Sequence, residues 1–189
     1  MLNFSKFIEI VISFQSILIS SMIPVFISIP IIDKSKNFFE IPITWQIPTL
    51  IFLSILYKPE IVNKAFSIYL LIGLFFLPIF HQGGSLGYLL TPNFGYLIGM
   101  FPLIKIINNL NNKNRIKTFD FIKNGILAIF AMHLTGIIYI LIQLIFYQKI
   151  EFILYNISNY TFGKIGYHLL MLCPLLLVIK TIEYIKKRV

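Results

Sequence analysis

The sequence is poor in charge, in acidic residues and in cysteine. Only 12% of its 189 residues are charged, 7 are Asp or Glu, and Cys173 is the single cysteine. One cysteine excludes an internal disulfide and a zinc site built from several cysteines. The low charge excludes an ordinary soluble domain, in which about 25% of the residues are charged.

Apolar residues dominate the chain instead. Hydrophobic residues make up 58% of the sequence, and the mean hydropathy is +0.86. A helix of about 20 apolar residues crosses the hydrocarbon core of a bilayer. Six apolar segments of suitable length are residues 7–32, 41–57, 61–80, 86–107, 119–147 and 161–185. We therefore predict an all-α integral membrane protein, a bundle of six transmembrane helices that forms one membrane-embedded domain over residues 1–189.

Prolines interrupt several of these apolar segments. Pro24, Pro48, Pro102 and Pro174 are among those that lie inside them. Because proline has no backbone N–H and clashes with the preceding turn, each is expected to kink its helix. A bundle tolerates such kinks where neighbouring helices surround them.

Lysine and arginine are distributed unevenly between the two sides of such a bundle. When successive loops are assigned alternately to the two sides, 12 of the 16 Lys and Arg residues fall on one side. The other side receives Lys34, Lys36, Lys149 and Lys164. Cytoplasmic loops carry the excess of Lys and Arg, so we expect both chain termini in the cytoplasm.

Several functional classes have no support in the sequence. The net charge of +9 does not indicate a nucleic-acid partner, because the basic residues lie between apolar segments and not along one face. The sequence has no phosphate-binding loop, no His-x-x-x-His motif and no clustered pair of acids. We therefore expect neither an enzyme nor a cofactor or metal, and any energy from ATP must come from another subunit.

Two stretches on the expected outer side are unlike lipid-facing helix. Thr44 and Gln46 flank Trp45 in the first, and Gly83 and Gly84 are paired in the second. Threonine and glutamine can bond a ligand at a pocket mouth, and paired glycines let a ligand approach the backbone closely. Two plainer interpretations stay open: Trp45 belongs to the interfacial belt of aromatic residues, and the glycines form an ordinary tight turn.

Four motifs follow one another between residues 41 and 100. They are Ile41-Pro42-Ile43-Thr44-Trp45-Gln46, Gly73-Leu74-Phe75-Phe76-Leu77-Pro78-Ile79-Phe80, Gly83-Gly84-Ser85-Leu86-Gly87 and Thr91-Pro92-Asn93-Phe94-Gly95-Tyr96. Their order and spacing resemble the BioY family, the biotin-specific substrate-binding components of energy-coupling-factor (ECF) transporters. The family pattern has Pro-x-Thr-x-Gln, then Gly-Leu-x-x-x-Pro-x-Phe, a glycine-rich loop and Gly-Pro-x-Gly-Gly-Tyr.

The resemblance implies that the protein captures biotin on the outer side of a plasma (inner) membrane. The resemblance also implies that the protein functions together with a transmembrane coupling subunit and ATPase subunits. Biotin carries a cyclic urea, an apolar ring and chain, and a carboxylate, so its pocket needs amide-type partners, an aromatic wall and one cation. The substrate-binding residues that we expect are Thr44, Trp45, Gln46, Gly83, Gly84, Ser85, Tyr88, Asn93, Tyr96 and Lys164.

The region around Lys164 departs from the family pattern. The family's last helix opens with Pro-Gly-Asp-x-x-Lys, whose Asp and Lys help to hold the ligand, whereas residues 160–168 here contain no acid. Phe94 also replaces one glycine of the family pattern. Two alternatives therefore stay open, a substrate-binding component for another vitamin and a membrane scaffold that does not transport.

Two further pairs of residues have more than one interpretation. Ser16 and Ser20 lie four apart, and the resemblance implies that they contact the coupling subunit, although such pairs also serve packing within one chain. His133 and His168 lie within apolar segments, where an ionisable side chain indicates a functional site. The alternative is a neutral histidine that forms a hydrogen bond between two helices.

Overall fold

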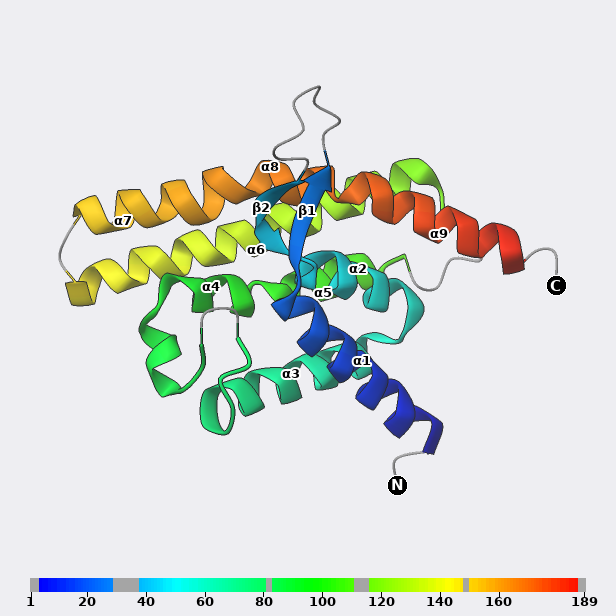
Figure 1. The fold of residues 1–189 in the computed structure, drawn as a ribbon, viewed down its shortest axis with the longest axis horizontal. Helices are drawn as coiled ribbons and strands as arrows, with labels where there is room; N and C mark the ends of the chain where they lie inside the picture. Colours follow the sequence, from blue (N-terminus) through cyan, green and yellow to red (C-terminus); the bar gives the residue numbers. More distant parts are fainter. Residues whose placement is uncertain (1–3, 29–37, 81–82, 111–115, 148–149, 187–189) are drawn as a thin grey trace.

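The structure is a computed structural model that describes residues 4–28, 38–80, 83–110, 116–147 and 150–186. Helices make up nearly all of it, together with one antiparallel pair of strands (Figure 1). In chain order the elements are α1 (Phe4–Met22), β1 (Pro24–Ser28), β2 (Phe38–Thr44), α2 (Gln46–Leu56), α3 (Pro59–Phe75), η1 (Leu86–Leu90), α4 (Pro92–Ile98), α5 (Met100–Asn108), α6 (Thr118–Tyr147), α7 (Ile150–Ile157), η2 (Ser158–Phe162), α8 (Gly163–Leu170) and α9 (Leu172–Lys186).

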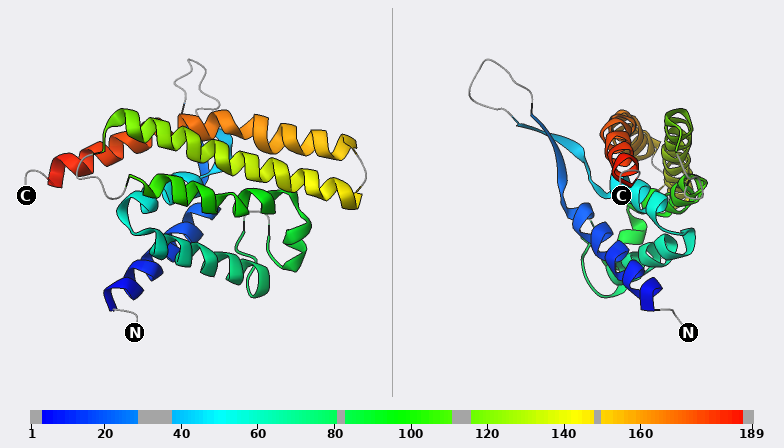
Figure 2. Two further views of the ribbon diagram at one scale, coloured as in Figure 1. Left: turned by 180° about the vertical axis from the view of Figure 1, so that it is seen from behind. Right: turned by 90° about the vertical axis from the view of Figure 1, so that its right-hand side faces the viewer.

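Two long helical rods lie side by side. One is α6, and the other is the series from α7 through η2 and α8 to α9, which runs in the opposite direction (Figures 1 and 2). Helices α4 and α5 pack against α6, while α1 and α3 pack against each other on the far side of α5. The strand β2 passes over the other rod at α8.

Three helical stretches in the described part of the chain are long and apolar enough to cross a membrane. They are Phe4–Met22, Thr118–Gln143 and Ile150–Ile185, and the shorter α2 is also apolar. This agrees with a mainly helical, multi-pass membrane protein. The predicted count of six spans and the orientation of the termini remain predictions.

The strand pair replaces helix that the sequence analysis predicted. The segment 7–32 was expected to be helical throughout, but α1 ends at Met22 and β1 begins at Pro24. The segment 41–57 likewise begins in β2 before α2 starts at Gln46. Proline cannot continue the hydrogen bonding of a helix but is tolerated as the first residue of a strand.

The strand pair has its own small core. Val25 pairs with Ile41 in the antiparallel register, and together with Ile43 they bury a cluster against Met171, at the junction of α8 and α9. Alternate residues of a strand point to one face, so Ile41 and Ile43 face the helices together. The backbone N–H of Trp45 donates to the carbonyl of Ile23, which closes the pair beside α2.

The last helical segment is longer than predicted. It was expected to begin at residue 161, but helix is continuous from Ile150 and includes η2. Lys164, assigned to an outer loop in the charge count, therefore lies within α8. The other three lysines assigned to that side, at positions 34, 36 and 149, are outside the described residues.

The four prolines expected to kink helices lie near the starts of elements, and Pro102 and Pro174 each follow a one-residue break in the helix, at Gly99 and Met171. Pro24 is the first residue of β1, and Pro48, Pro102 and Pro174 are each the third residue of a helix. The first N–H groups of a helix have no carbonyl to bond within it, so proline loses nothing there. The same reasoning explains α3, in which Pro59 is the first helical residue.

Glycines allow α4 and α5 to approach α6 closely. A side-chain carbon at Gly99 would lie 2.5 Å from the carbonyl oxygen of Met132, and one at Gly136 would lie 2.5 Å from the ring of Tyr96. Such small residues let helix backbones come together where no water drives them to associate. The contact fixes Tyr96 between α4 and α6.

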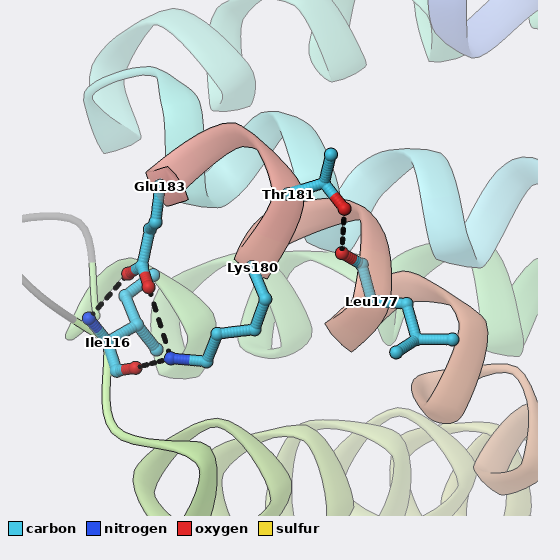
Figure 3. A network of polar contacts seen from close by, with 5 residues as sticks. All are labelled: Ile116, Leu177, Lys180, Thr181 and Glu183. Atoms are coloured by element: carbon cyan, nitrogen blue, oxygen red, sulfur yellow. Dashed lines mark hydrogen bonds and ion pairs between the residues drawn. The ribbon is translucent and has the colours of Figure 1, made fainter. Parts of the chain in front are cut away.

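A polar network ties the start of α6 to the last helix (Figure 3). Glu183 Oε1 accepts a hydrogen bond of 2.7 Å from the backbone N–H of Ile116, and Lys180 Nζ donates to the carbonyl of the same residue. Lys180 and Glu183 also form an ion pair at 3.1 Å. Thr181 lies outside this network and donates to the carbonyl of Leu177.

Candidate functional site

A cavity of about 110 Å³ lies where four parts of the chain meet. The end of β2 and the start of α2 form one wall, η1, α4 and α5 a second, and η2 and α8 a third, with one residue from α6. The lining residues are Pro42, Ile43, Thr44, Gln46, Ile47, Tyr88, Asn93, Tyr96, Leu97, Met100, Met132, Tyr160, Lys164 and His168. An apolar and aromatic wall with a few polar groups is typical of small-molecule sites.

Tyrosines form the aromatic part of the wall, and each is held by a neighbour. The hydroxyls of Tyr96 and Thr161 lie 2.6 Å apart, which joins α4 to η2. The side chains of Tyr88 and Asn93 are hydrogen-bonded to each other. The η2 stretch that carries Thr161 and Tyr160 is π-helical, a local widening that often occurs at functional sites.

Side chains of α6 hold η1 in place. Tyr139 Oη donates to the carbonyl of Leu89, and Gln143 Nε2 donates to the carbonyl of Leu90 at 2.9 Å. These bonds satisfy backbone acceptors of a short helix that has few partners of its own. They thereby fix the position of Tyr88, one residue earlier in η1.

Gln46 presents an unused donor to the cavity. Its side chain is 6% exposed, and its Nε2 has no hydrogen-bond partner in the described part of the chain. A buried donor without a partner costs about 1–3 kcal/mol, so this position favours a ligand that supplies an acceptor.

Lys164 gives the cavity its charge. It is half-buried in α8, with Nζ 4.9 Å from the centroid of the Tyr160 ring, close enough for a cation–π contact. Among the described residues that line the cavity it is the only one with a formal charge at neutral pH, and none is acidic. The cavity is therefore suited to a ligand with a negative group.

His168 is a lining residue that the sequence analysis did not place in the site. Its Nδ1 lies 3.0 Å from Nε2 of His133, and both side chains are buried. The alternative of histidines that bond between two helices is thus the arrangement observed for α6 and α8. The spacing of Lys164 and His168, four residues on one helix, was the available signal, because such residues share a face.

Six of the ten predicted substrate-binding residues line this one cavity. They are Thr44, Gln46, Tyr88, Asn93, Tyr96 and Lys164. Trp45 is not among the lining residues and is 40% exposed, as expected for the interfacial alternative. Gly83, Gly84 and Ser85 are not among them either.

The glycine-rich loop packs against the end of α3 instead. A side-chain carbon at Gly84 would lie 2.5 Å from the Cα of Pro78 and 2.7 Å from the carbonyl oxygen of Gly73. Ser85 N donates to that same carbonyl at 2.9 Å. Gly83 has a φ of +130°, in the region that favours glycine. These contacts fit the tight-turn alternative.

Residues 83–87 also match the Gly-x-Ser-x-Gly spacing of hydrolase nucleophiles, although their surroundings differ. That motif requires a sheet strand before the serine, an α-helix after it and a histidine beside it. Here the serine precedes the short η1, and the two described histidines, His133 and His168, bond to each other. The spacing alone therefore carries no catalytic assignment.

Ser16 and Ser20 differ in their surroundings. Ser20 is buried on the face of α1 that packs inside this chain, and its hydroxyl donates to the carbonyl of Ile17 at 3.0 Å. Ser16 is half-buried at the edge of that face and donates to the carbonyl of Ile12 at 2.8 Å. Of the two, Ser16 is the more accessible to a partner.

Comparisons with known proteins agree with one another. The model of the BioY family matches residues 6–179. Among solved structures, the fold is similar to a crystal structure at 2.1 Å described as the S-component for biotin from an ECF-type ABC transporter. That likeness covers 95% of each chain, with a TM-score of 0.60 and 20% sequence identity. No curated protein matches the sequence.

Proposed function

The chain belongs to the BioY family, and from this premise we propose that it is the substrate-binding component of a biotin transporter. It captures biotin at the cavity and passes it across the membrane with energy from separate subunits. Family membership favours biotin over another vitamin and over a scaffold without a ligand. The observation that carries the proposal is the cavity lining, which combines aromatic walls with one cation and one unused amide donor.

The chemistry of biotin fits each part of this lining. The carbonyl of its cyclic urea is an acceptor for Nε2 of Gln46, the donor without a partner. The apolar ring and chain lie against the tyrosines and the neighbouring aliphatic side chains. The carboxylate pairs with Lys164, since a charge-assisted hydrogen bond is stronger than a neutral one.

The same proposal includes the setting of the protein. We infer six transmembrane spans in a plasma membrane, with both termini in the cytoplasm. A transmembrane coupling subunit and ATPase subunits complete the transporter, and Ser16 on α1 is the proposed contact with the coupling subunit. These subunits should co-purify with the chain in mild detergent.

Equilibrium binding of labelled biotin to the purified full chain tests the function. A second ligand, biotin amide, lacks the negative charge and isolates the role of Lys164. Lys164→Ala should weaken the binding of biotin more than the binding of biotin amide, because only the acid has a charge that can pair with Lys164. Lys105→Ala is the matched control, since Lys105 is exposed near the end of α5. Equal losses for both ligands would contradict the assignment of Lys164, and no binding of biotin by the native chain would contradict the function.

A further inference from the structure

Two buried histidines meet at the edge of the cavity. His133 on α6 is 1% exposed, His168 on α8 is 7% exposed, and the ring of Tyr96 packs against His133 with the centroids 5.5 Å apart. His168 lines the cavity one helical turn after Lys164. The proposed function above uses neither histidine.

The ring nitrogen of His133 that has no partner, Nδ1, indicates which histidine donates the hydrogen bond between the two rings. Its Nδ1 is buried and has no hydrogen-bond partner in the described ranges. A buried N–H without an acceptor is rarer in proteins than a buried acceptor without a donor. His133 therefore holds its proton on Nε2 and donates it to Nδ1 of His168, 3.0 Å away.

This arrangement fixes what His168 offers to a ligand. A neutral histidine has one proton, and a ring that accepts at Nδ1 must hold that proton on Nε2. His168 thus presents an N–H donor to the cavity on the helix face that also carries Lys164. With no acid among the described lining residues, this end of the cavity has two donors and no competing carboxylate.

We propose that His168 is a second ligand of the substrate carboxylate, beside Lys164, and that His133 is the positioning residue that sets its tautomer. The inference rests on the proposed function, because it takes biotin as the substrate. One carboxylate oxygen receives the N–H of His168, and the other receives the ammonium of Lys164. The pair thereby favours an acid over its neutral amide.

Matched substitutions separate the two roles. His168→Asn keeps an acceptor for His133 at the δ position but removes the N–H at the ε position. We expect this variant to raise the dissociation constant for biotin by about tenfold or more, the usual effect of losing a charge-assisted hydrogen bond. The dissociation constant for biotin amide should change much less. His133→Gln retains an N–H at the ε position that can donate to His168, so this variant should still bind biotin in preference to biotin amide. His133→Leu has no such donor and should lose that preference. Tyr167→Phe, at an exposed residue of α8, should change neither ligand.

Calorimetric titration with both ligands measures these ratios, and ¹⁵N spectra of histidine-labelled native protein report the tautomers directly. Native protein that does not bind biotin would overturn the proposed function and this inference together. Biotin binding with an unchanged ratio in His168→Asn would overturn only the inference. If that variant fails to fold, the spectra decide, and a proton on Nδ1 of His168 would overturn the inference.

Discussion

At the scale of single residues, Gln46 is the sharpest probe of the site because its buried donor has no partner. Gln46→Ala should weaken the binding of biotin by about 1–3 kcal/mol, the cost of leaving a buried polar partner unpaired. This corresponds to a rise of about 5- to 150-fold in the dissociation constant. Gln15→Ala, at an exposed position of α1, is the control in the same binding assay. An affinity unchanged by Gln46→Ala would remove this residue from the site.

Gly84 has a structural role that its sequence context did not reveal. The sequence suggested that it leaves space for a ligand, but the neighbours of its backbone are Pro78 and Gly73. Gly84→Ala should therefore lower the free energy of unfolding by about 1–3 kcal/mol, as overpacking does, and affect binding only through the loop. Gly87→Ala is the matched control, since its side-chain carbon would meet only Ser85 Oγ at 3.6 Å. Equal thermal unfolding of the two variants in detergent would contradict this packing.

At the scale of elements, the close approach of α5 to α6 depends on one backbone contact. A side-chain carbon at Gly99 would lie 2.5 Å from a carbonyl oxygen, which cannot rotate away as a side chain can. We expect Gly99→Ala to separate the helices and to lower the free energy of unfolding by about 1–3 kcal/mol. Gly166→Ala on α8 meets no atom within 4 Å and should be close to neutral. Thermal unfolding of both variants in detergent measures the difference.

The sequence predicted some elements well for a clear physical reason. The helix predicted at 119–147 is observed as Thr118–Tyr147, because a long and evenly apolar run has only one way to satisfy its backbone in lipid. The strands β1 and β2 were missed because a short apolar run fits a strand as well as a helix. The extension of the last helix was missed because Asn156 and its polar neighbours end the apolar run. In the structure Asn156 donates to the carbonyl of Phe152, within the helix.

The cavity was predictable only in part. Some lining residues stand out in the sequence because they are polar and lie next to a break in the apolar pattern, where a helix that faces lipid would carry apolar side chains. Examples are Thr44, Gln46 and Asn93. The pairing of His133 with His168 could not be recognised from the sequence, because the two residues are 35 positions apart on two different helices. Only the packing of α6 against α8 brings them together.

At the scale of the whole molecule, the polar network of Figure 3 joins two segments that are far apart in the sequence. Ile116 lies just before α6, and Lys180 and Glu183 lie in the last turns of α9. The charge count assigned both regions to the cytoplasmic side, and their contact agrees with that grouping. The contact requires only that both segments face the same side of the membrane.

The orientation therefore calls for a direct measurement. With Lys164 inside α8, three lysines remain of the four on the outer side, against twelve basic residues on the other, so the bias persists. Since basic loops stay in the cytoplasm, a thiol at Gln148 should face outward and one at Val189 inward. The exposed Cys173 is first replaced by serine, so that each variant carries a single cysteine. A membrane-impermeant maleimide should label Gln148→Cys in intact cells and Val189→Cys only after permeabilisation. Labelling of Val189→Cys in intact cells would reverse the orientation and place the Ile116–Glu183 contact outside.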